Sequence, residues 1–320
     1  MKKIFSAILT GPHDYQHFKE KADKGIQLFF CLLGQLKCAL IKLFLFNFLY
    51  GKINQITMKV DSHDISFSTI DKYSKLWFFP RYSKKRLHEP ILTRLLIDSL
   101  SQGQTFVDVG ANLGYFTCLI GKLFPANQIF SFEVDPQAFT LLEKNIKLNN
   151  LDNIKAYNCG ISNKEGFVKI PKNSTPDPRL SIIVNDADAN DGLAVRSVDL
   201  DSFFLNEECR PDVIKIDVEG AELLVLQGMR SLLEKENLTI FLELHGNILS
   251  NFGTNSKEVI SLLQSLNYDI YEIKGFRKNN FNEKIELIEL GSSNLIQRNI
   301  MCYAIKHDSQ PKFDHLKIGG

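Results

Sequence analysis

The sequence predicts an α/β fold with a mostly parallel, doubly wound sheet covered by helices on both faces. Three observations support this. Short strand-like runs alternate with amphipathic helical patterns from residue 89 onward. A glycine-containing turn joins the first of these strands to its helix, and acidic residues stand at the ends of later strands. At 320 residues, with 44% hydrophobic and 23% charged residues, the chain can form a large core and is not disordered.

Charge and cysteine usage exclude some partners. Lys and Arg number 38 against 37 Asp and Glu, which gives a formal charge of +1. This balance supplies no general attraction for nucleic acid, so we expect no nucleic-acid partner. The six cysteines form no CxxC pair and no zinc-ligand spacing. They are typical of reduced thiols, and we therefore expect a cytoplasmic protein.

Residues 1–53 form a hydrophobic and basic extension. Within residues 26–50, 19 of 25 residues are apolar, and the polar ones do not gather on one helical face. Lys37 and Lys42 lie near the middle of this segment and disfavour insertion by about 2.5–3.5 kcal/mol each. Three interpretations stay open: a membrane span, a helix on the membrane surface, or a helix packed on the main domain.

The main domain is expected over residues 54–310. Its first part reads as a β-hairpin and a helix, followed by regular strand–helix alternation. Asp135 and Pro136 form a good helix start, with an N-cap and a proline at the first helical position. The predicted strands are 55–60, 64–68, 105–109, 128–133 and 154–158, and the predicted helices are 89–100, 115–124 and 136–149.

The alternation breaks over residues 163–206, which we interpret as a β insertion with short strands at 166–170, 180–184 and 194–198. It then resumes, and a final strand reached without a helix should lie antiparallel at or near one edge of the sheet. Residues 311–320 are expected to be a tail. The later strands are 212–217, 238–244, 268–273, 284–290 and 300–306, with helices at 221–234 and 256–266.

The turn after the first core strand is the first motif with chemical content. The run Phe106-Val-Asp-Val-Gly-Ala-Asn-Leu-Gly114 contains Asp108, Gly110, Ala111, Asn112 and Gly114. Glycines here let the backbone approach a ligand at the carboxyl edge of the sheet. Glu133, followed by Val134, ends the next strand, where a carboxylate can accept both hydroxyls of an adenosine ribose. The pattern predicts a nucleoside-cofactor site. The alternative is a tight turn with a surface acid.

The position of Asp108 bears on which cofactor binds. A dinucleotide motif has the form GxGxxG and brings a pyrophosphate onto the helix N-terminus. A carboxylate two residues before Gly110 would repel a pyrophosphate. It suits the ammonium and sulfonium groups of S-adenosylmethionine, which we therefore favour over NAD.

Two later strands end in groups that can move protons. The run Asp212-Val-Ile-Lys-Ile-Asp-Val-Glu-Gly-Ala-Glu222 delivers Asp217 and Glu219, and Ile240-Phe-Leu-Glu-Leu-His245 delivers Glu243 and His245. In a doubly wound sheet these strand ends border the switch-point crevice, so Asp217, Glu219 and His245 should face the reactive end of the cofactor. The alternatives are a helix-capping role for Glu219 and a structural role for His245.

If the cofactor donates its methyl group to an alcohol, the site must align the alcohol oxygen with that methyl group and remove the hydroxyl proton. We predict that His245 is the base and that Asp217 and Glu219 orient the hydroxyl or the imidazole. The sequence shows no closely spaced ligand motif, so we predict no metal site. A divalent metal held by the carboxylates and His245 stays open as the alternative.

The ordered set of motifs resembles the FkbM family of S-adenosylmethionine-dependent methyltransferases. It consists of 106–114, 132–136, Ser197-Val-Asp-Leu-Asp201, 214–222 and 243–245. Val134 departs from the proline expected in many members. The resemblance implies a Rossmann-like class I methyltransferase fold. It also implies O-methylation of a hydroxyl on a sugar, a glycan or a polyketide-type natural product. The alternatives are an NAD-dependent oxidoreductase and a membrane-attached binding protein with a degenerate cofactor site.

Overall fold

The computed structural model describes residues 53–71, 73–74, 87–172, 192–277, 285–309 and 316–319. The chain divides into two compact units, Met1–His88 and Glu89–Gly320. The sequence predicted domain boundaries at residues 53 and 310. These differ from the division at residue 88 and stay a prediction. The apolar segment 26–50 lies outside the described residues. Among the residues described, no helix combines the length and the apolar character needed to cross a bilayer.

The N-terminal unit contains a two-stranded antiparallel hairpin of β1 (Gln55–Val60) and β2 (His63–Ser68). Exposed and buried residues alternate along β1, as they do in a strand with one face covered. The predicted hairpin is confirmed.

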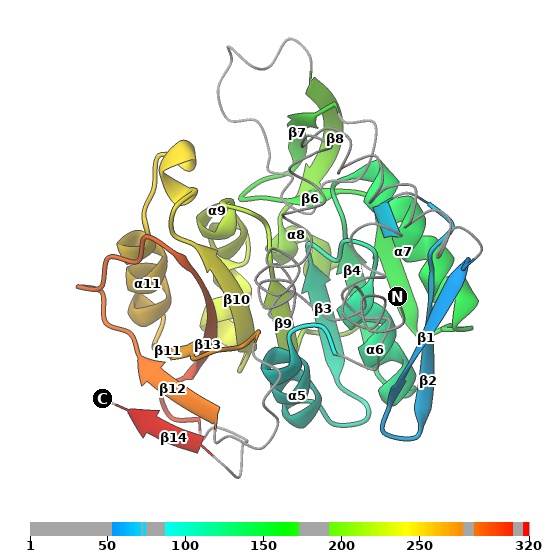
Figure 1. Ribbon diagram of the computed structural model, residues 1–320. Helices are drawn as coiled ribbons and strands as arrows, with labels where there is room; N and C mark the ends of the chain where they lie inside the picture. Colours follow the sequence, from blue (N-terminus) through cyan, green and yellow to red (C-terminus); the bar gives the residue numbers. More distant parts are fainter. Residues whose placement is uncertain are drawn as a thin grey trace, which may run out of the picture. The chain divides into compact units, whose positions relative to one another are not determined.

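The second unit is built on a nine-stranded sheet with the order β14-β12-β11-β13-β10-β9-β3-β4-β5 (Figure 1). The five strands β10, β9, β3, β4 and β5 are parallel to one another. The strands are β3 (Thr105–Val109), β4 (Gln128–Phe132), β5 (Ile154–Tyr157), β9 (Val213–Ile216), β10 (Thr239–His245), β11 (Tyr268–Ile273), β12 (Ile285–Glu289), β13 (Asn299–Lys306) and β14 (Leu316–Gly319). The fold class predicted from the sequence is confirmed.

The far side of the sheet is antiparallel. Strand β13 inserts between β10 and β11 and runs antiparallel to both, as expected for a strand reached without a helix. Strand β12 pairs antiparallel with β11, and β14 pairs parallel with β12 at the edge. Residues 316–319, expected to lie in a tail, therefore extend the sheet.

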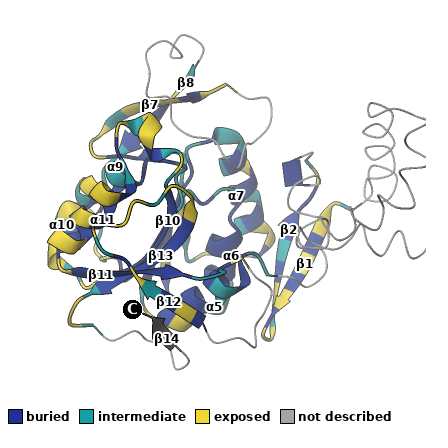
Figure 2. Cartoon of the chain, turned by 60° about the vertical axis from the view of Figure 1, so that its left-hand side comes forward, coloured by how far each residue is buried: buried dark blue, intermediate teal, exposed yellow. Residues whose placement is uncertain are grey.

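Helices cover both faces of the sheet (Figure 2). On one face lie α5 (Pro90–Ser99), α6 (Tyr115–Leu123) and α7 (Pro136–Leu148). The other face carries α8 (Leu200–Leu205), α9 (Glu222–Gln227), α10 (Arg230–Lys235) and α11 (Ser256–Ser265). A short 3₁₀ helix, η3 (Leu249–Phe252), follows β10.

The period-two alternation of β3 determines which side chains reach which face. Val107 and Val109 join the core cluster with residues of α8–α11. Asp108 therefore points to the opposite face, where its carboxylate contacts Thr117 of α6.

The helix predicted over 221–234 is two helices, because Gly228 breaks it. A Cβ at Gly228 would collide with the carbonyl group of Ser162, so the chain passes too close for a continuous helix with larger residues. The break exposes the amides at the start of α10. The Asp201 carboxylate accepts hydrogen bonds from two of them, the amides of Ser231 (2.7 Å) and Leu232 (2.8 Å).

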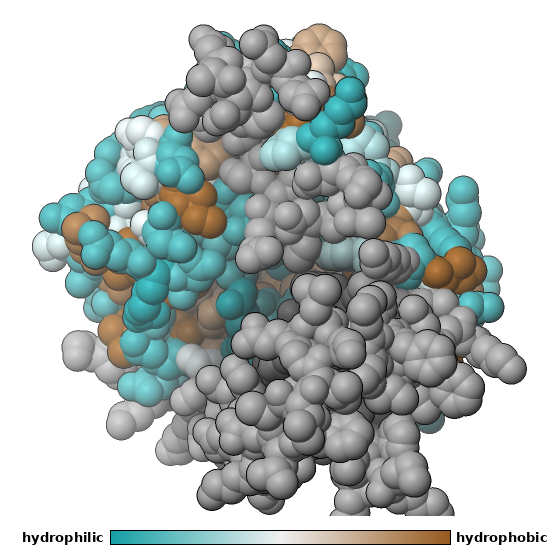
Figure 3. Space-filling model, turned by 45° about the horizontal axis from the view of Figure 1, so that its top comes forward, coloured by the Kyte–Doolittle hydropathy of each residue, from teal (hydrophilic) through white to brown (hydrophobic). Residues whose placement is uncertain are grey.

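The predicted β insertion is a three-stranded sheet with the order β6-β8-β7, in which β6 (Gly160–Ile161) also borders the site described below. Strand β7 covers Gly166–Pro171 and β8 covers Gly192–Val198. The strand expected at 180–184 lies outside the described residues. On the face shown in Figure 3, the described residues are mostly hydrophilic, and hydrophobic ones form small separate patches.

Candidate active site

The site lies where the strand order reverses. The chain runs outward from β3 through β4 to β5, and then returns to place β9 on the other side of β3. At this switch point the loops leaving β3 and β9 diverge and open a crevice at the carboxyl ends of the strands. A pocket of about 700 Å³, including its solvent-open mouth, occupies this place.

Gly110 shapes the floor of the pocket. Its amide and that of Ala111 both donate to the Phe132 carbonyl, at 2.9 and 3.0 Å, which ties the turn to the end of β4. Gly110 has a φ of 79°, and a Cβ there would collide with the carbonyl oxygen of Asp217. Only glycine satisfies both the left-handed backbone and this close approach.

Glu133 is buried in the pocket wall, and two backbone amides hold its carboxylate. The amide of Asn112 donates to Oε2 at 2.7 Å, and that of Asp135 donates to Oε1 at 2.8 Å. Burial raises the pKa of Glu133 to about 7, against the opposing effect of these two hydrogen bonds. Each oxygen keeps a second lone pair for a ligand. Asn112 and Val134 line the pocket beside it, as predicted.

The sequence analysis did not include the apolar wall of this pocket. Cys159, Gly160 and Ile161 line it from the start of the β insertion, together with Ala138 of α7. A two-residue strand carries no periodic signal, so its contribution could not be read from the sequence. This wall could cover one face of a bound adenine.

Gly114 and Ala111, both predicted to bind the cofactor, are not among the residues that line the pocket. Gly114 has a φ of 88°, and a Cβ there would meet the Leu142 side chain of α7. Its role in this geometry is to let α6 start close to α7.

Asp108 also differs from its expected placement. It is 1% exposed and does not line the pocket. Its Oδ2 accepts a hydrogen bond from the Thr117 hydroxyl at 2.7 Å, and its Oδ1 lies 3.7 Å from Nζ of Lys215. Its cationic neighbour is thus a buried lysine of β9, which the sequence analysis did not single out. Burial raises the pKa of Asp108, and Lys215 opposes this.

Lys215 lies between Asp108, two residues before Gly110, and Asp217, the first residue after β9. Its Nζ lies 3.4 Å from Oδ2 of Asp217 and stands over the Phe116 ring of α6. Burial would lower the pKa of Lys215, but the Asp217 and Asp108 carboxylates raise it above its ordinary value. The lysine is therefore a permanent cation between two acids.

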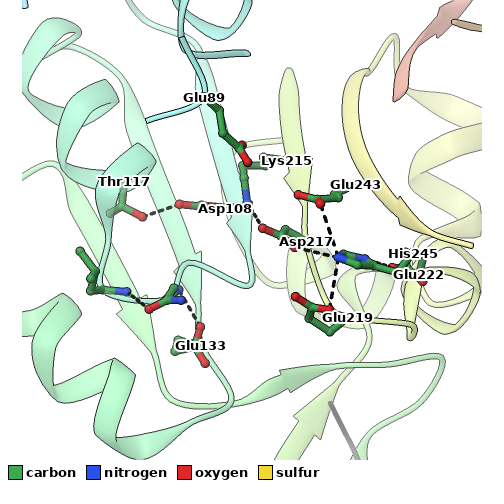
Figure 4. A network of polar contacts seen from close by, with 12 residues as sticks. Glu89, Asp108, Thr117, Glu133, Lys215, Asp217, Glu219, Glu222, Glu243 and His245 are labelled. Atoms are coloured by element: carbon green, nitrogen blue, oxygen red, sulfur yellow. Dashed lines mark hydrogen bonds and ion pairs between the residues drawn. The ribbon is translucent and has the colours of Figure 1, made fainter. Parts of the chain in front are cut away.

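The strand ends bring Asp217, Glu219 and His245 together, as predicted (Figure 4). The imidazole Nε2 lies 3.3 Å from Oε2 of Glu219, 3.6 Å from Oε1 of Glu243 and 3.9 Å from Oδ1 of Asp217. The sheet register explains the juxtaposition. Ile216 pairs with Leu242, so Asp217, the first residue after β9, lies beside Glu243, which is still in β10.

The other imidazole nitrogen has a partner that the sequence analysis did not assign. Nδ1 of His245 lies 2.7 Å from Oε1 of Glu222, in the first turn of α9. The Gly220 amide donates to the same oxygen at 3.0 Å. A glutamate three residues after another acidic residue in a helix start resembles an ordinary capping residue, so the sequence offered no signal for this contact.

The carboxylates around His245 differ in acidity. Burial would raise the pKa of Asp217, but Lys215 and His245 lower it below its ordinary value. Burial raises the pKa of Glu219 to about 7 and that of Glu243 to about 8. Burial opposes protonation of His245, yet the Glu222 hydrogen bond and the nearby carboxylates raise its pKa to about 9. The predicted role of His245 as the base requires a neutral imidazole, whereas these neighbours favour the imidazolium.

Arg277 and Glu89 complete the cluster and were not predicted. Arg277 donates to Oε1 of Glu243 at 2.6 Å and to Oε1 of Glu89 at 2.9 Å. It thereby connects the loop after β11 to the end of β10 and to the start of α5. Arg277 and Glu89 are 188 positions apart in the sequence, and Arg277 and Glu243 are 34 apart. Local sequence patterns do not reveal contacts over such separations.

The site is a switch-point pocket of a Rossmann-like sheet, with a glycine turn, an acid at the end of β4 and a histidine–carboxylate cluster at the ends of β9 and β10. The methyltransferase FkbM domain model matches residues 108–270. The chain belongs to this family. The match confirms the resemblance and favours a methyltransferase over an NAD-dependent oxidoreductase.

Two relatives of this chain are named methyltransferases. Methyltransferase sdnD of Sordaria araneosa is 32% identical over 164 residues, covering 42% of this chain and 63% of that protein. Hexuronic acid methyltransferase AglP of Haloferax volcanii is 26% identical over 196 residues, covering 61% of this chain and 74% of that protein. The chain thus spans less than two thirds of the Sordaria protein. A crystal structure of methyltransferase FkbM from Methylobacillus flagellatus is 16% identical, with a TM-score of 0.40 over 64% of this chain and 44% of that chain.

Proposed function

We propose that this methyltransferase transfers a methyl group from S-adenosylmethionine to a hydroxyl oxygen of a sugar, a glycan or a natural product. The observation that carries the proposal is the continuity of the two parts of the site. Glu133 and the turn at Gly110 line the same pocket as Asp217 and Glu219, whose carboxylates reach His245. A cofactor held by the first group would therefore present its reactive end to the second.

The residues at the first part of the pocket fit an adenosine-containing cofactor. Gly110 leaves space that a Cβ would fill, and Glu133 offers two carboxylate oxygens at the pocket wall. In the proposed complex Glu133 accepts the ribose hydroxyls, while Val134 and the wall from Cys159 to Ile161 border the base. In this proposal Asp108 does not contact the cofactor. It pairs with Lys215, which in turn faces Asp217 at the pocket.

The second part of the pocket would handle the acceptor. Bound S-adenosylmethionine supplies an electrophilic methyl group: the S–C bond breaks with its electrons kept by sulfur, the acceptor oxygen forms the new O–C bond, and the hydroxyl proton is released. Asp217 and Glu219 line the pocket and would bind this hydroxyl. One of these two carboxylates would receive the proton. His245 does not line the pocket, but its Nε2 lies 3.3 Å from Oε2 of Glu219 and would hold that carboxylate in place.

The acceptor class and location are inferred from the relatives and the composition. The Haloferax relative is named a hexuronic acid methyltransferase, which supports a carbohydrate acceptor. The net charge of +1 gives no electrostatic support for a nucleic-acid acceptor. We place the enzyme in the cytoplasm because the described cysteines are free thiols.

Two measurements test the proposal. Mass spectrometry of glycans and lipids from producing and deletion cells should show the loss of one methylene mass from a single class of molecule in the deletion strain. Calorimetry of the purified full chain should show binding of S-adenosylhomocysteine. Absence of binding would contradict the cofactor assignment. Binding without any change in glycans or lipids would contradict a glycan acceptor and would leave a small natural product as the acceptor class.

A variant of the cluster separates binding from chemistry. His245→Ala should retain S-adenosylhomocysteine binding and lose about 10²–10⁴-fold in turnover, the usual effect of removing a proton-transfer group. Near-normal turnover in a folded variant would remove His245 from the mechanism.

A further inference from the structure

We propose that Asp217, Glu243 and His245 bind a divalent first-row transition-metal ion, and that Mn²⁺ is a suitable probe for it. One ligand atom from each of the three side chains lies within 4.8 Å of the others. Glu243 and His245 are buried, and Asp217 also lines the cofactor pocket. The inference rests on the proposed function, because it assigns to the ion the activation of the same acceptor hydroxyl.

The spacing of the three groups favours a shared ion over direct hydrogen bonds. Nε2 of His245 lies 3.6 Å from Oε1 of Glu243 and 3.9 Å from Oδ1 of Asp217. Hydrogen bonds between such atoms are about 2.7–3.2 Å long. Ligands bound at about 2.0–2.2 Å to one ion lie about 3–4 Å apart for ordinary bond angles. Oε1 of Glu243 also accepts a hydrogen bond from Arg277 at 2.6 Å, so the ion would share this carboxylate with the guanidinium.

The orientation of His245 is an independent observation that points to a ligand. Its Nδ1 is held by Oε1 of Glu222 at 2.7 Å, and the Gly220 amide holds that carboxylate oxygen in turn. The two side chains are 1% and 0% exposed. This arrangement leaves Nε2 directed at the carboxylates of Glu219, Glu243 and Asp217. A histidine ligand to a metal typically has its second nitrogen on a carboxylate in this way.

The local charge also favours a bound cation. The described residues around the site include the carboxylates of Glu89, Asp108, Asp217, Glu219, Glu222 and Glu243. The permanent cations beside them are Lys215 and Arg277. Lys215 faces Oδ2 of Asp217, so Oδ1 is the oxygen turned toward His245. A divalent ion would replace the proton on Nε2 of His245 and would offset the carboxylate charge that Lys215 and Arg277 leave.

The donor set indicates the kind of ion and its effect. One imidazole with two carboxylates suits Mn²⁺, Fe²⁺ or Zn²⁺, whereas Mg²⁺ prefers oxygen ligands alone. Three protein ligands leave coordination positions open for an acceptor hydroxyl. Such an ion would make that hydroxyl more acidic. Glu219 lines the pocket 3.3 Å from Nε2 of His245, where it could take the released proton.

The test measures metal binding directly. The full-length chain, treated with EDTA and then dialysed, is titrated with MnCl₂ while free Mn²⁺ is followed by electron paramagnetic resonance. We expect saturable binding of one ion per chain, with Mg²⁺ competing only weakly. Glu243→Gln and His245→Gln should each weaken Mn²⁺ binding at least about tenfold, because each removes a ligand atom. Circular dichroism confirms that the variants are folded.

Glu272→Gln is the matched control. Glu272 is also a buried glutamate of the sheet that pairs with an arginine, Arg298, at 2.7 Å, but it does not belong to the cluster. This variant should bind Mn²⁺ like the unaltered chain. No saturable binding, equal losses in the control, or Mg²⁺ binding as tight as Mn²⁺ binding would overturn the inference.

A second titration separates this inference from the proposed function. S-adenosylhomocysteine binding is measured by calorimetry with and without Mn²⁺. A chain that binds S-adenosylhomocysteine and methylates its acceptor in EDTA supports the proposed function and overturns the metal site. A chain that binds Mn²⁺ at the three residues but not S-adenosylhomocysteine supports the metal site and overturns the cofactor assignment.

Discussion

Nδ1 of His245 lies 2.7 Å from Oε1 of Glu222, and both side chains are fully buried although they come from a strand end and from the following layer of helices. The contact fixes the imidazole plane, and it gives a buried charged group its counter-charge. Because the second nitrogen faces the Asp217, Glu219 and Glu243 carboxylates, one hydrogen bond sets the orientation of the whole cluster.

Glu222→Ala should destabilise the protein strongly. The change leaves the buried Nδ1 of His245 without its hydrogen-bond partner, which costs about 1–3 kcal/mol of unfolding free energy. Asp217, Glu219 and Glu243 still offset the imidazolium charge. Urea unfolding followed by circular dichroism measures the change. The control is Glu234→Ala, which removes an exposed pair with Arg230 and should cost less than about 1 kcal/mol. Similar losses in the two variants would show that the buried contact adds nothing.

Glu133→Ala should weaken S-adenosylhomocysteine binding about ten- to a hundredfold. The carboxylate is expected to accept two ribose hydrogen bonds, and losing such charge-assisted bonds costs about 1.5–3 kcal/mol. Calorimetry on the folded variant measures the change. Glu143→Ala, at an exposed position of α7, is the control and should leave the affinity unchanged. Unchanged affinity in Glu133→Ala would contradict the assignment of Glu133 to the ribose hydroxyls.

S-adenosylhomocysteine affinity should also depend on pH through Glu133. Its pKa is raised to about 7, so the carboxyl is mostly protonated at pH 6 and mostly ionised at pH 8. Ribose hydroxyls donate to the ionised form, and we therefore expect affinity to rise from pH 6 to pH 8 and to level off above that. The same titrations on Glu133→Gln isolate this contribution. An equal pH dependence in the variant would assign it to another group.

Three glycines with similar backbones should respond differently to alanine. Gly103, Gly110 and Gly114 have φ values of 88°, 79° and 88°. A Cβ at Gly103 meets nothing within 4 Å, one at Gly114 meets a Leu142 side chain, and one at Gly110 meets the Asp217 backbone. Thermal unfolding should rank the losses as Gly110 > Gly114 > Gly103, because a side chain can move and a sheet backbone cannot. Gly103→Ala reports the backbone strain alone, and a larger loss there than at Gly110 would contradict the ranking.

The apolar segment 26–50 should change where the protein is found. We expect the full chain to float with anionic lipid vesicles, because apolar residues and the basic extension both favour such a surface. A chain beginning at residue 54 should remain in the unbound fraction. Full-length protein that is wholly unbound, and monodisperse without detergent, would rule out both a span and a surface anchor.

Much of the site could be predicted because its residues follow directly from strand ends. Gly110, Glu133, Asp217 and His245 all come at or just after a buried strand, and parallel strands bring their carboxyl ends to one edge. The sequence alone therefore determined the fold class, the position of the pocket and the three residues that gather beside it. It also indicated the family, because the ordered motifs are specific.

Only the tertiary structure decided what each side chain contacts. Asp108 faces Thr117 and Lys215 rather than the pocket, because alternation along β3 turns it to the opposite face. Glu222 and Arg277 reach the cluster through the packing of α9 and of the loop after β11, and no local pattern encodes such distant contacts. Strand identity is a short-range property of periodicity and turns. The partner of a buried charge depends on which distant elements pack together, and the protonation of His245 depends in turn on those partners.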